Sequence, residues 1–464
     1  MSDRFLSPDF NPTRDLAELV ARARFADLSP RAVECAKTFL LDTLGCGIAG
    51  GTGPKVDALV GAAGGWGEGG QATVWGSDRR LPAPQAALAN GYQIHALEWD
   101  CVHEPAVVHP MATLIPALLA HAERRSAAGR PVSGTDLLLA LSLGVEIAAM
   151  IGAASKSVMK FFRPATCGGF GVVAGLGSME GLNADTMMHA FGIQYGQTSG
   201  TMQAHVEGSL LLGLQVGFNG RAGLTSVDLA MAGLTGPQQV LTGMYGYYKL
   251  FETEHDIAGW WPRLGREWQI TRLSHKPFPS GRLTHAAVDA IQQARAELGF
   301  GPDDVQSMSA SVPPLTHRLV GRPDIADPAP NYARLCIPYV SAITLIDGAC
   351  GPEAFAAGRL RDPAVHALAA RISVSLDSNP DVNALWPQHF VIELRDGRRW
   401  ERRIETPIGH PDNPLSRERH LAKFRKCWAI GGMAAEGGEA LIGQVDSLEQ
   451  CPDVANLARM LARN

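Results

Sequence analysis

Segments with helical periodicity follow one another from about Asp15 to Phe251, and several of them are apolar on almost every side. Apolar residues recur three and four positions apart, Asp, Ser, Thr or Pro precedes them, and Gly follows them. The stretch DLLLALSLGVEIAAMIGAA is long enough to cross a membrane, but Glu146 and glycines in its middle favour a buried helix. Helices that are apolar all round lie inside a large helical assembly. The sequence therefore predicts a mainly α fold.

The pattern changes to strands beyond about Gln306. The runs SMSASVPPL, ARISVSLD and QHFVIELRDGRRWERRIETP are rich in strand-forming residues, and RDGRR suits a hairpin turn. Helical segments lie between these runs, which predicts a smaller α+β domain over residues 270–406. The last segment, NPLSRERHLAKFRKCWAIGG, is helical again. We expect residues 1–269 and 407–464 to form one large all-helical domain.

Charge and cysteine content limit the partners and the compartment. A formal net charge of −5 gives no basic field for nucleic acid or an anionic membrane, so we expect neither partner, and an acidic substrate needs a local cationic pocket. The eight cysteines lack CxxC pairing, and the start MSDRFLSPDFNPTRDL lacks the basic residues and apolar run of a signal peptide. We expect reduced thiols and a cytoplasmic protein.

A glycine stretch, GAAGGWGEGG, contains Gly65, Gly67 and Gly70 in the spacing GxGxxG. A dinucleotide site needs a strand before this turn and a helix after it. Here the helical segment KVDALVGAAG comes first and the short strand QATVWG follows. We interpret the stretch as a flexible surface turn.

The stretch HALEWDCVHEPAVVHP concentrates histidines and acids between His95 and Pro110. It lacks the helical HExxH of a zinc site, and Pro105 separates His103 from His109, so we predict no metal there. Asp100 and His103 are three residues apart, and on one helical turn they would share a face as a proton-transfer pair. Alternatively, the histidines cap and hydrogen-bond a helix–loop–helix corner.

Three other stretches offer cations or a phenol. In SHKPFPSGRLTHAAVDA, two prolines stiffen a loop that carries Lys276 and Arg282 before a helix, which suits a carboxylate or phosphate. An ordinary linker with its charges in water fits equally well. Arg163 precedes small residues in FFRPATCGGFG, which suit an oxyanion loop or a tight helix crossing. Tyr339 begins an apolar helix, as a proton donor or as a half-buried core residue.

Three motifs in order resemble the MmgE/PrpD family over about Asp15 to Cys427. ANGYQIHALEWDCVHEPAVVHP resembles the family's A-N-G-x-x-x-H-x-L-D-x-D-D-x-H segment with a following His-Pro. HKPFPSGRLTHAAVDA resembles its K-P-Y-P-C-C-R-x-T-H-x-x-x-D-A segment, and IETPIGHPDNPLSRERHLAKF resembles its P-x-G-x-P-x-N-P-L-S signature. Known members are 2-methylcitrate dehydratase, cis-aconitate decarboxylase and iminodisuccinate epimerase.

The resemblance implies an all-helical domain, a smaller α+β domain, a cleft between them, a homodimer, and cofactor-free chemistry on small polycarboxylates. It implies acid/base or substrate-binding roles for His103 and Lys276, with Asp100 supporting His103. Tyr339 is a further candidate for the catalytic acid or base. The residues expected to bind the carboxylates are Arg163, Arg282 and His109.

Departures from the family motifs guide the choice of reaction. The family's Lys-Arg-Leu-His-Pro-Gly stretch is replaced by the residues from Leu212 to Gly217, so a lysine and a histidine are absent. Dehydration and decarboxylation both rely on extra acidic and cationic groups, whereas epimerisation needs one proton removed and one returned. We therefore expect an epimerase of a dicarboxylate such as iminodisuccinate. The alternatives are a lyase of the dehydratase or decarboxylase type, and a non-catalytic scaffold.

Overall fold

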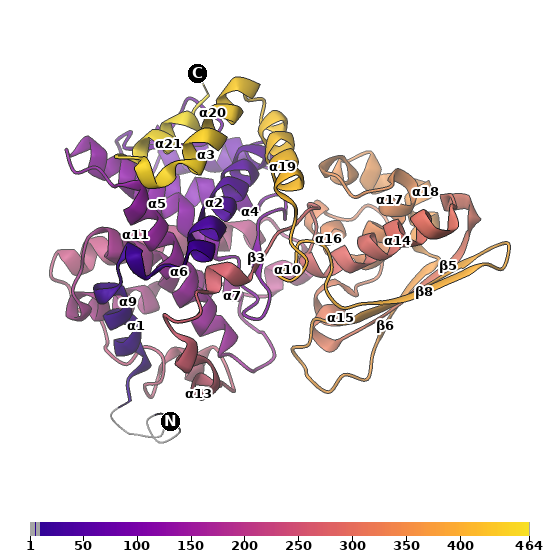
Figure 1. Ribbon diagram of the computed structural model, residues 1–464, viewed down its shortest axis with the longest axis horizontal. Helices are drawn as coiled ribbons and strands as arrows, with labels where there is room; N and C mark the ends of the chain where they lie inside the picture. The colour runs from indigo at the N-terminus through magenta and orange to yellow at the C-terminus, as the bar shows by residue number, and fades with distance from the viewer. Residues whose placement is uncertain (1–4, 6–9, 464) are drawn as a thin grey trace.

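The structure, a computed structural model, describes Phe5 and residues 10–463. It contains a larger helical body and a smaller body of one sheet with helices, which lie beside each other (Figure 1). Helices dominate the described chain, and the predicted mainly α fold is confirmed.

The larger body is built from helices near both ends of the chain. Those from the first part are α1 (Pro12–Arg22), α2 (Pro30–Gly50), α3 (Val56–Gly64), α4 (Ala83–His95), α5 (Pro110–Ala127), α6 (Gly134–Ala153), α7 (Arg163–Thr166), α8 (Gly168–Met179), α9 (Ala184–Gln197), α10 (Gln203–Glu207), α11 (Leu211–Met231), α12 (Tyr247–Leu250) and α13 (Ile257–Trp260). Those from the last part are α19 (Arg417–Ile430), α20 (Ala435–Asp446) and α21 (Ala455–Met460). In Figure 1 the yellow C-terminal helices lie on the indigo and purple ones, and α19 packs on α2 while α21 packs on α5.

The larger body is not purely helical, which corrects the prediction of an all-helical domain. Strands β1 (Ala72–Thr73) and β2 (Arg80–Leu81) pair as a short antiparallel hairpin. This hairpin follows the glycine stretch that the sequence presents as a turn. Asn90 of α4 holds it, because its side chain accepts from the Trp75 backbone and donates to the Thr73 carbonyl.

Helix α6 lies at the centre of the larger body. It is the described helix that is long and apolar enough to cross a membrane, and 94% of its most apolar window is buried inside the protein. Ser133 caps its first turn together with Asp136. Its buried Glu146 accepts from the backbone amides of Gly265 (3.0 Å) and Gln269 (2.8 Å), and burial raises the pKa of this carboxyl to about 7. The predicted buried helix is confirmed.

The smaller body has a four-stranded sheet in the order β6-β5-β7-β8. Its strands are β5 (Val305–Val312), β6 (Ile372–Leu376), β7 (Gln388–Leu394) and β8 (Arg399–Ile404). Strand β5 runs parallel to β6 and antiparallel to β7. The predicted hairpin joins β7 to β8, and Gly397 there takes φ +87°, which glycine adopts without strain. Alternate residues of β7 are buried, so one face of the sheet is covered.

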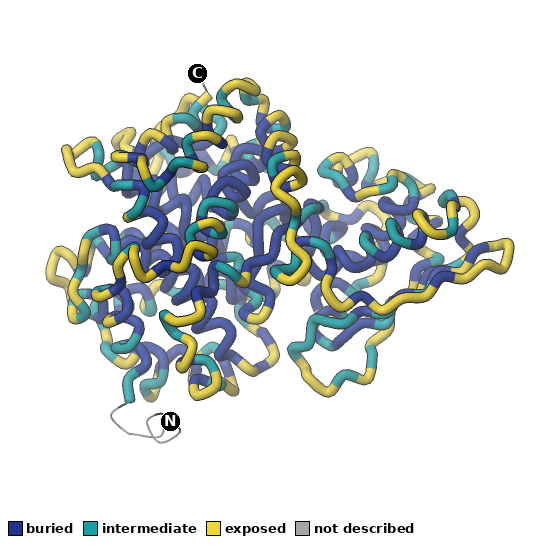
Figure 2. Tube along the Cα trace, viewed as in Figure 1, coloured by how far each residue is buried: buried dark blue, intermediate teal, exposed yellow. Residues whose placement is uncertain are grey.

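Helices cover that face of the sheet. Helices α14 (His285–Leu298), α15 (Pro314–Val320) and α17 (Ile337–Asp347) contact its strands, and α16 (Pro330–Arg334) and α18 (Pro363–Ala369) pack on α17. Helix α14 contacts β7 and β8, and α17 contacts α14 and β6. Figure 2 shows a buried interior in both bodies, with the exposed hairpin at the far end of the smaller one.

Two short strands join the motifs that the sequence singled out. Strand β3 (Val102–His103) pairs antiparallel with β4 (Leu273–Ser274), in the register Val102↔Ser274 and His103↔Leu273. Helix α4 ends at His95, so Asp100 lies in a loop and His103 in a strand. The expectation that Asp100 and His103 share one helical turn is therefore wrong.

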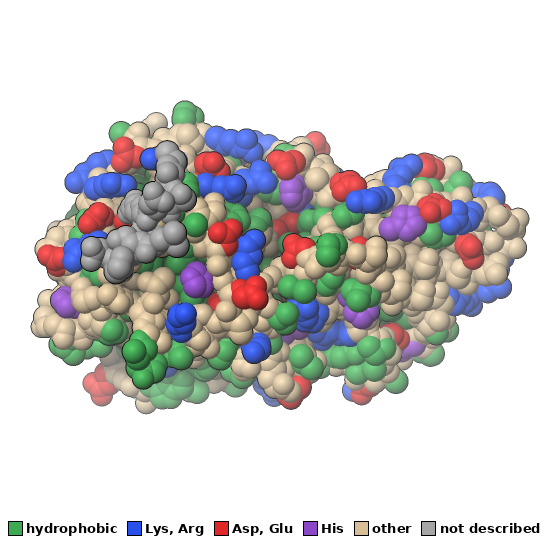
Figure 3. Space-filling view, turned by 90° about the horizontal axis from the view of Figure 1, so that it is seen from below, with side chains coloured by type: hydrophobic (Ala, Val, Ile, Leu, Met, Phe, Trp, Pro, Cys, Tyr) green, Lys and Arg blue, Asp and Glu red, His purple; other side chains and the backbone are tan. Residues whose placement is uncertain are grey.

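The face of the molecule in Figure 3 carries acidic and basic side chains interspersed with each other. Neither sign gathers into a broad patch on this face. A net charge of −5 spread in this way leaves local pockets to set the binding of charged ligands.

Candidate active site

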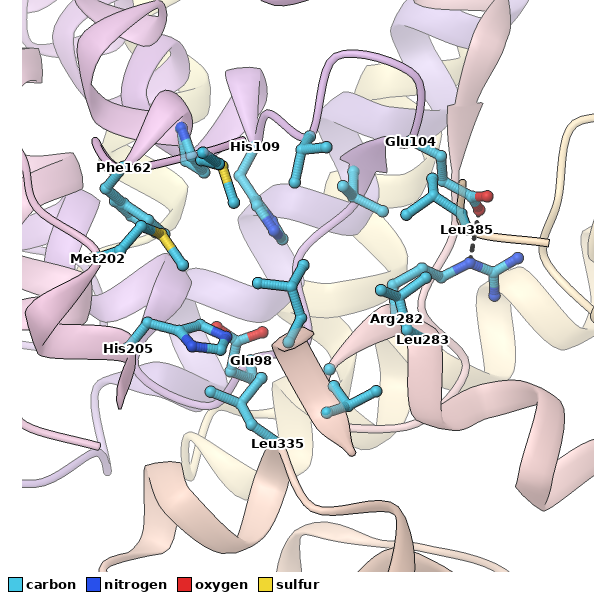
Figure 4. Close-up of a pocket in the computed structure, with 17 residues that line it drawn as sticks. Glu98, Glu104, His109, Phe162, Met202, His205, Arg282, Leu283, Leu335 and Leu385 are labelled. Atoms are coloured by element: carbon cyan, nitrogen blue, oxygen red, sulfur yellow. Dashed lines mark hydrogen bonds and ion pairs between the residues drawn. The ribbon is translucent and has the colours of Figure 1, made fainter. Parts of the chain in front are cut away.

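A cavity of about 80 Å³ lies between the two bodies (Figure 4). The larger body lines it with Glu98, Val102, Glu104, Val107, His109, Met159, Phe162, Pro164, Met202 and His205. The smaller body and the segment before it supply Gly281, Arg282, Leu283, Leu319, Val320, Leu335 and Leu385. A single water needs about 10–15 Å³, so the cavity has room for a small organic molecule.

His109 has the geometry of a general acid or base. It stands at the N-terminus of α5, and its Nδ1 lies 2.8 Å from Oδ2 of Asp100. The carboxylate accepts the Nδ1 proton, which leaves Nε2 to exchange a proton with a molecule in the cavity. Figure 4 shows the His109 ring directed into the cavity. Burial lowers the pKa of His109 and outweighs the opposing effect of Asp100.

Asp100 belongs to a chain of buried charges behind His109. His95 Nδ1 lies 3.0 Å from Asp100, His95 Nε2 lies 3.0 Å from Glu98, and Glu98 lies 2.7 Å from Lys276 Nζ. Burial alone would lower the pKa of His95, but Asp100 and then Glu98 raise it to about 10. His95 is therefore an imidazolium at neutral pH. Two carboxylates face two cations, and this chain of contacts is balanced in charge.

The turn after α4 aims Glu98 at these partners. Glu98 takes φ +52°, a left-handed conformation that non-glycine residues seldom adopt. Burial alone would raise the pKa of its carboxyl, but Lys276 and then His95 hold it well below the usual range. A strained backbone that places a fully paired carboxylate beside a cavity is typical of functional sites.

His205 presents a hydrogen-bond donor from the other side. Its Nδ1 lies 3.0 Å from Nη2 of Arg322. An arginine only donates, so Nδ1 accepts and the proton of the neutral ring sits on Nε2. Burial, and then Arg322, lowers the pKa of His205 to about 3, so the ring stays neutral. In Figure 4 His205 lies beside Glu98 and directed toward the cavity.

The cationic lining residue, Arg282, is already paired. Its Nε donates to Glu104 at 2.7 Å, and its Nη1 donates to the Ile408 carbonyl at 2.7 Å. Ser274 and Trp386 also donate to Glu104. Burial alone would raise the pKa of Glu104, but Arg282 and then these donors lower it. Arg282 thus joins the two bodies more than it attracts an anion.

His103 does not line the cavity. Its Nδ1 accepts from the Ala106 backbone at 3.2 Å, and its Nε2 lies 3.0 Å from Oε1 of Gln269. Burial lowers its pKa to about 4. Both ring nitrogens therefore hold the corner together, which matches the alternative role that the sequence left open. The partner of Asp100 is His109, a residue expected only to bind substrate.

Four other predicted residues also lie outside the lining, of which Asp100 stands directly behind His109. Arg163 is buried against Glu252, with both of its contacts to that carboxylate at 2.9 Å. The Tyr339 hydroxyl donates to the Ala354 carbonyl at 2.7 Å. Lys276 lies behind Glu98. Sequence reasoning missed His205, which stands in no motif, and it did not give roles to His95 and Glu98 although both lie in the quoted stretch.

Two groups of described residues have the donor atoms of a metal site within 4.8 Å of one another: His95 with Asp100 and His109, and Asp42 with His275 and His420. In the first group, Nδ1 of His95 and Nδ1 of His109 both lie within 3.0 Å of the Asp100 carboxylate, the arrangement of a proton-sharing series. In the second, the Lys423 ammonium lies 2.8 Å from Asp42 and already neutralises it. Proton transfer is the chemistry that the first group suits best.

The models of two protein domains match this chain. The MmgE/PrpD N-terminal domain matches residues 14–259, and the MmgE/PrpD C-terminal domain matches residues 278–444. The chain belongs to the MmgE/PrpD family. The C-terminal match includes α19, although α19 packs on α2 of the larger body. The domain limits drawn from the sequence at residues 269 and 406 stay a prediction.

Curated relatives are named for decarboxylation. Human cis-aconitate decarboxylase is 28% identical over 468 residues, which cover 97% of this chain and 94% of the relative. The mouse enzyme of the same name is 28% identical over 97% of this chain and 93% of the relative. Cis-aconitate decarboxylase of Aspergillus terreus is 27% identical over 97% and 95%. The prediction of an iminodisuccinate epimerase is wrong, because these relatives point to a lyase.

Proposed function

We propose that this chain is a cofactor-independent lyase that removes carbon dioxide from a small unsaturated carboxylic acid. The observation that carries the proposal is the His109–Asp100 pair directed at a largely apolar cavity between the two bodies. The names of the relatives support the same class of reaction.

The reaction needs one carbon–carbon bond broken and one proton delivered. In a β,γ-type unsaturated acid, the bond to the departing carboxylate breaks and its electron pair forms a new double bond. The old double bond shifts its pair to the carbon next to the retained carboxylate. That carbon takes the proton from Nε2 of His109, carbon dioxide leaves, and water reprotonates the imidazole.

The surroundings of His109 fit this electron flow. Negative charge spreads from one carboxylate over several atoms in the transition state, so a water-poor lining disfavours the reactant more than the transition state. Met159, Phe162 and Met202 supply such a lining next to His109. Asp100 fixes the tautomer and stabilises the protonated ring before it donates.

The test is proton NMR of the purified protein with cis-aconitate in heavy water, together with carbon dioxide release. We expect a new vinylidene signal and one deuterium at the carbon next to the retained carboxylate. H109Q lowers the rate by about 10²–10⁴-fold, the size of a lost acid–base group. H389Q, at a half-exposed surface histidine, is the matched control. Hydration or dehydration without carbon dioxide would contradict the proposal.

A further inference from the structure

We infer that the preferred substrate has an apolar substituent where cis-aconitate carries its third carboxylate. This inference rests on the proposed decarboxylation and specifies its substrate class. It follows from the charges around the cavity, the composition of its wall, and the two donors that remain for a carboxylate.

The cations expected to hold carboxylates are each neutralised inside the protein. Arg282 is paired with Glu104 at 2.7 Å and Lys276 with Glu98 at 2.7 Å. Arg163 is likewise held by a buried carboxylate. All three pairs are buried, so an incoming carboxylate would have to displace an internal one and leave it without a partner. A substrate with three negative charges is therefore disfavoured.

The charged side chains that line the cavity also disfavour an additional carboxylate. Among the described residues that line the cavity, Arg282 is the arginine or lysine, and Glu98 and Glu104 are the acids. Arg334 lies close behind Leu335, over the ring of Phe355, and does not line the cavity. Its guanidinium donates to Oδ1 of Asn331 at 3.1 Å and to the Ala96 carbonyl at 3.4 Å, so it adds one buried positive charge behind this wall.

The wall of the cavity is largely apolar on both sides. Met159, Phe162 and Met202 come from the larger body. Leu319, Val320, Leu335 and Leu385 come from the smaller one. Figure 4 shows Phe162, Met202 and Leu335 around the space that His109 and His205 enter. An alkyl group in contact with this wall is removed from water, which favours binding about fourfold per buried methylene.

Among the described side chains that line the cavity, the rings of His205 and His109 each have a nitrogen directed at the acid. Nε2–H of His205 donates to one retained carboxylate, and protonated Nε2 of His109 delivers the proton to carbon. The departing carboxylate then lies against apolar side chains. A 3-alkylglutaconate meets this pattern, because it has the reacting atoms of cis-aconitate and an alkyl group in place of one carboxylate.

The experiment compares kcat/KM for cis-aconitate with that for the cis isomers of 3-methyl-, 3-ethyl- and 3-propylglutaconate. We expect at least a tenfold preference for the best alkyl acid over cis-aconitate, with a rise of about threefold to fourfold per methylene until the wall is filled. A preference for cis-aconitate over every alkyl acid would overturn the inference and leave the decarboxylation standing.

A binding measurement tests the inferred substrate class independently of the proposed decarboxylation. If no acid of the series loses carbon dioxide, the proposed function fails, and calorimetric binding of the same acids still decides the inference. Tighter binding of the alkyl acids than of cis-aconitate supports an apolar substituent. Equal or weaker binding overturns it.

A new cation in the wall gives a second readout. Met202 and Leu385 are half-buried, so M202K and L385K place an ammonium at the cavity from opposite bodies without burying it fully. Each is expected to shift the ratio of kcat/KM toward cis-aconitate by at least tenfold. M231K, at a 47% exposed surface methionine of the larger body, is the control and leaves the ratio unchanged. An unchanged ratio in both folded wall variants would contradict the inference.

Discussion

Nδ1 of His109 lies 2.8 Å from Oδ2 of Asp100, and the two residues stand on either side of the short strand β3. This contact orients the imidazole and leaves its other nitrogen for the cavity. Asp100 is also 3.0 Å from His95, so its carboxylate serves two rings. The proton-transfer unit is therefore a histidine–aspartate–histidine series.

Replacing Asp100 by Asn removes the acceptor charge and keeps the size of the side chain. We expect D100N to lower kcat by about 10²–10³-fold. Without the carboxylate, the Nδ1–H tautomer of His109 is no longer fixed and the protonated ring is no longer stabilised. The kinetic pKa of His109 should fall further, since Asp100 raises it in the native protein. Stopped-flow rates against pH check both effects. A D100N rate within threefold of wild type would remove Asp100 from the mechanism.

The pH dependence follows from the protonated form of His109. Burial lowers its pKa below the ordinary value of about 6.5, so only a minor fraction carries the proton at pH 8. We expect kcat/KM to rise as pH falls from 8 toward 6, by about tenfold per unit above the pKa. A profile that rises with pH over this range would assign His109 as a base instead.

His95 should make the free energy of unfolding decrease as the pH rises. Burial of His95 lowers its pKa, but Asp100 and Glu98 outweigh this effect and raise the pKa to about 10. The folded chain therefore binds the His95 proton more tightly than the unfolded chain. Its contribution is complete below about pH 6.5 and is lost as pH rises toward 10. The difference in Tm between wild type and H95Q should narrow from pH 6.5 to pH 9.5. A constant difference would show that His95 is neutral.

Variants of the Arg163–Glu252 pair test whether Arg163 has a structural role or binds substrate. Both side chains are buried, so E252Q leaves an arginine without its partner and lowers the free energy of unfolding by about 3–5 kcal/mol. D185A breaks an exposed pair with Arg14 and should cost at most about 1 kcal/mol. Denaturant titrations measure both. If E252Q keeps its stability and raises KM, Arg163 binds substrate as the sequence predicted.

The sequence revealed the helical body because its apolar residues repeat at helical spacing, and it revealed the hairpin because RDGRR carries its turn residues. It revealed β1 as the short strand QATVWG, but it did not reveal β2 or the pairing of these two strands, each two residues long. Asn90 of α4 holds the Thr73 carbonyl and the Trp75 amide beside this hairpin, and local periodicity does not predict a contact made by a distant helix.

The sequence located the region of the candidate site but not which of its residues contact each other. The stretch from His95 to His109 does hold the proton-transfer group, but a spacing argument that assumed helix chose His103 over His109. Pro105 and the left-handed Glu98 end helical geometry there, so distances along the sequence no longer give distances in space. Buried acids such as Glu252 neutralise distant cations, and that pairing depends on the tertiary structure alone.

The pairing of β3 with β4 has a consequence for folding. It joins Ser274 to Glu104, which are 170 residues apart in sequence, and each strand is two residues long. Closing so long a loop costs chain entropy that two short strands repay only when the helices around them have docked. We therefore predict that the cavity is assembled late in folding, after the helices around it have docked.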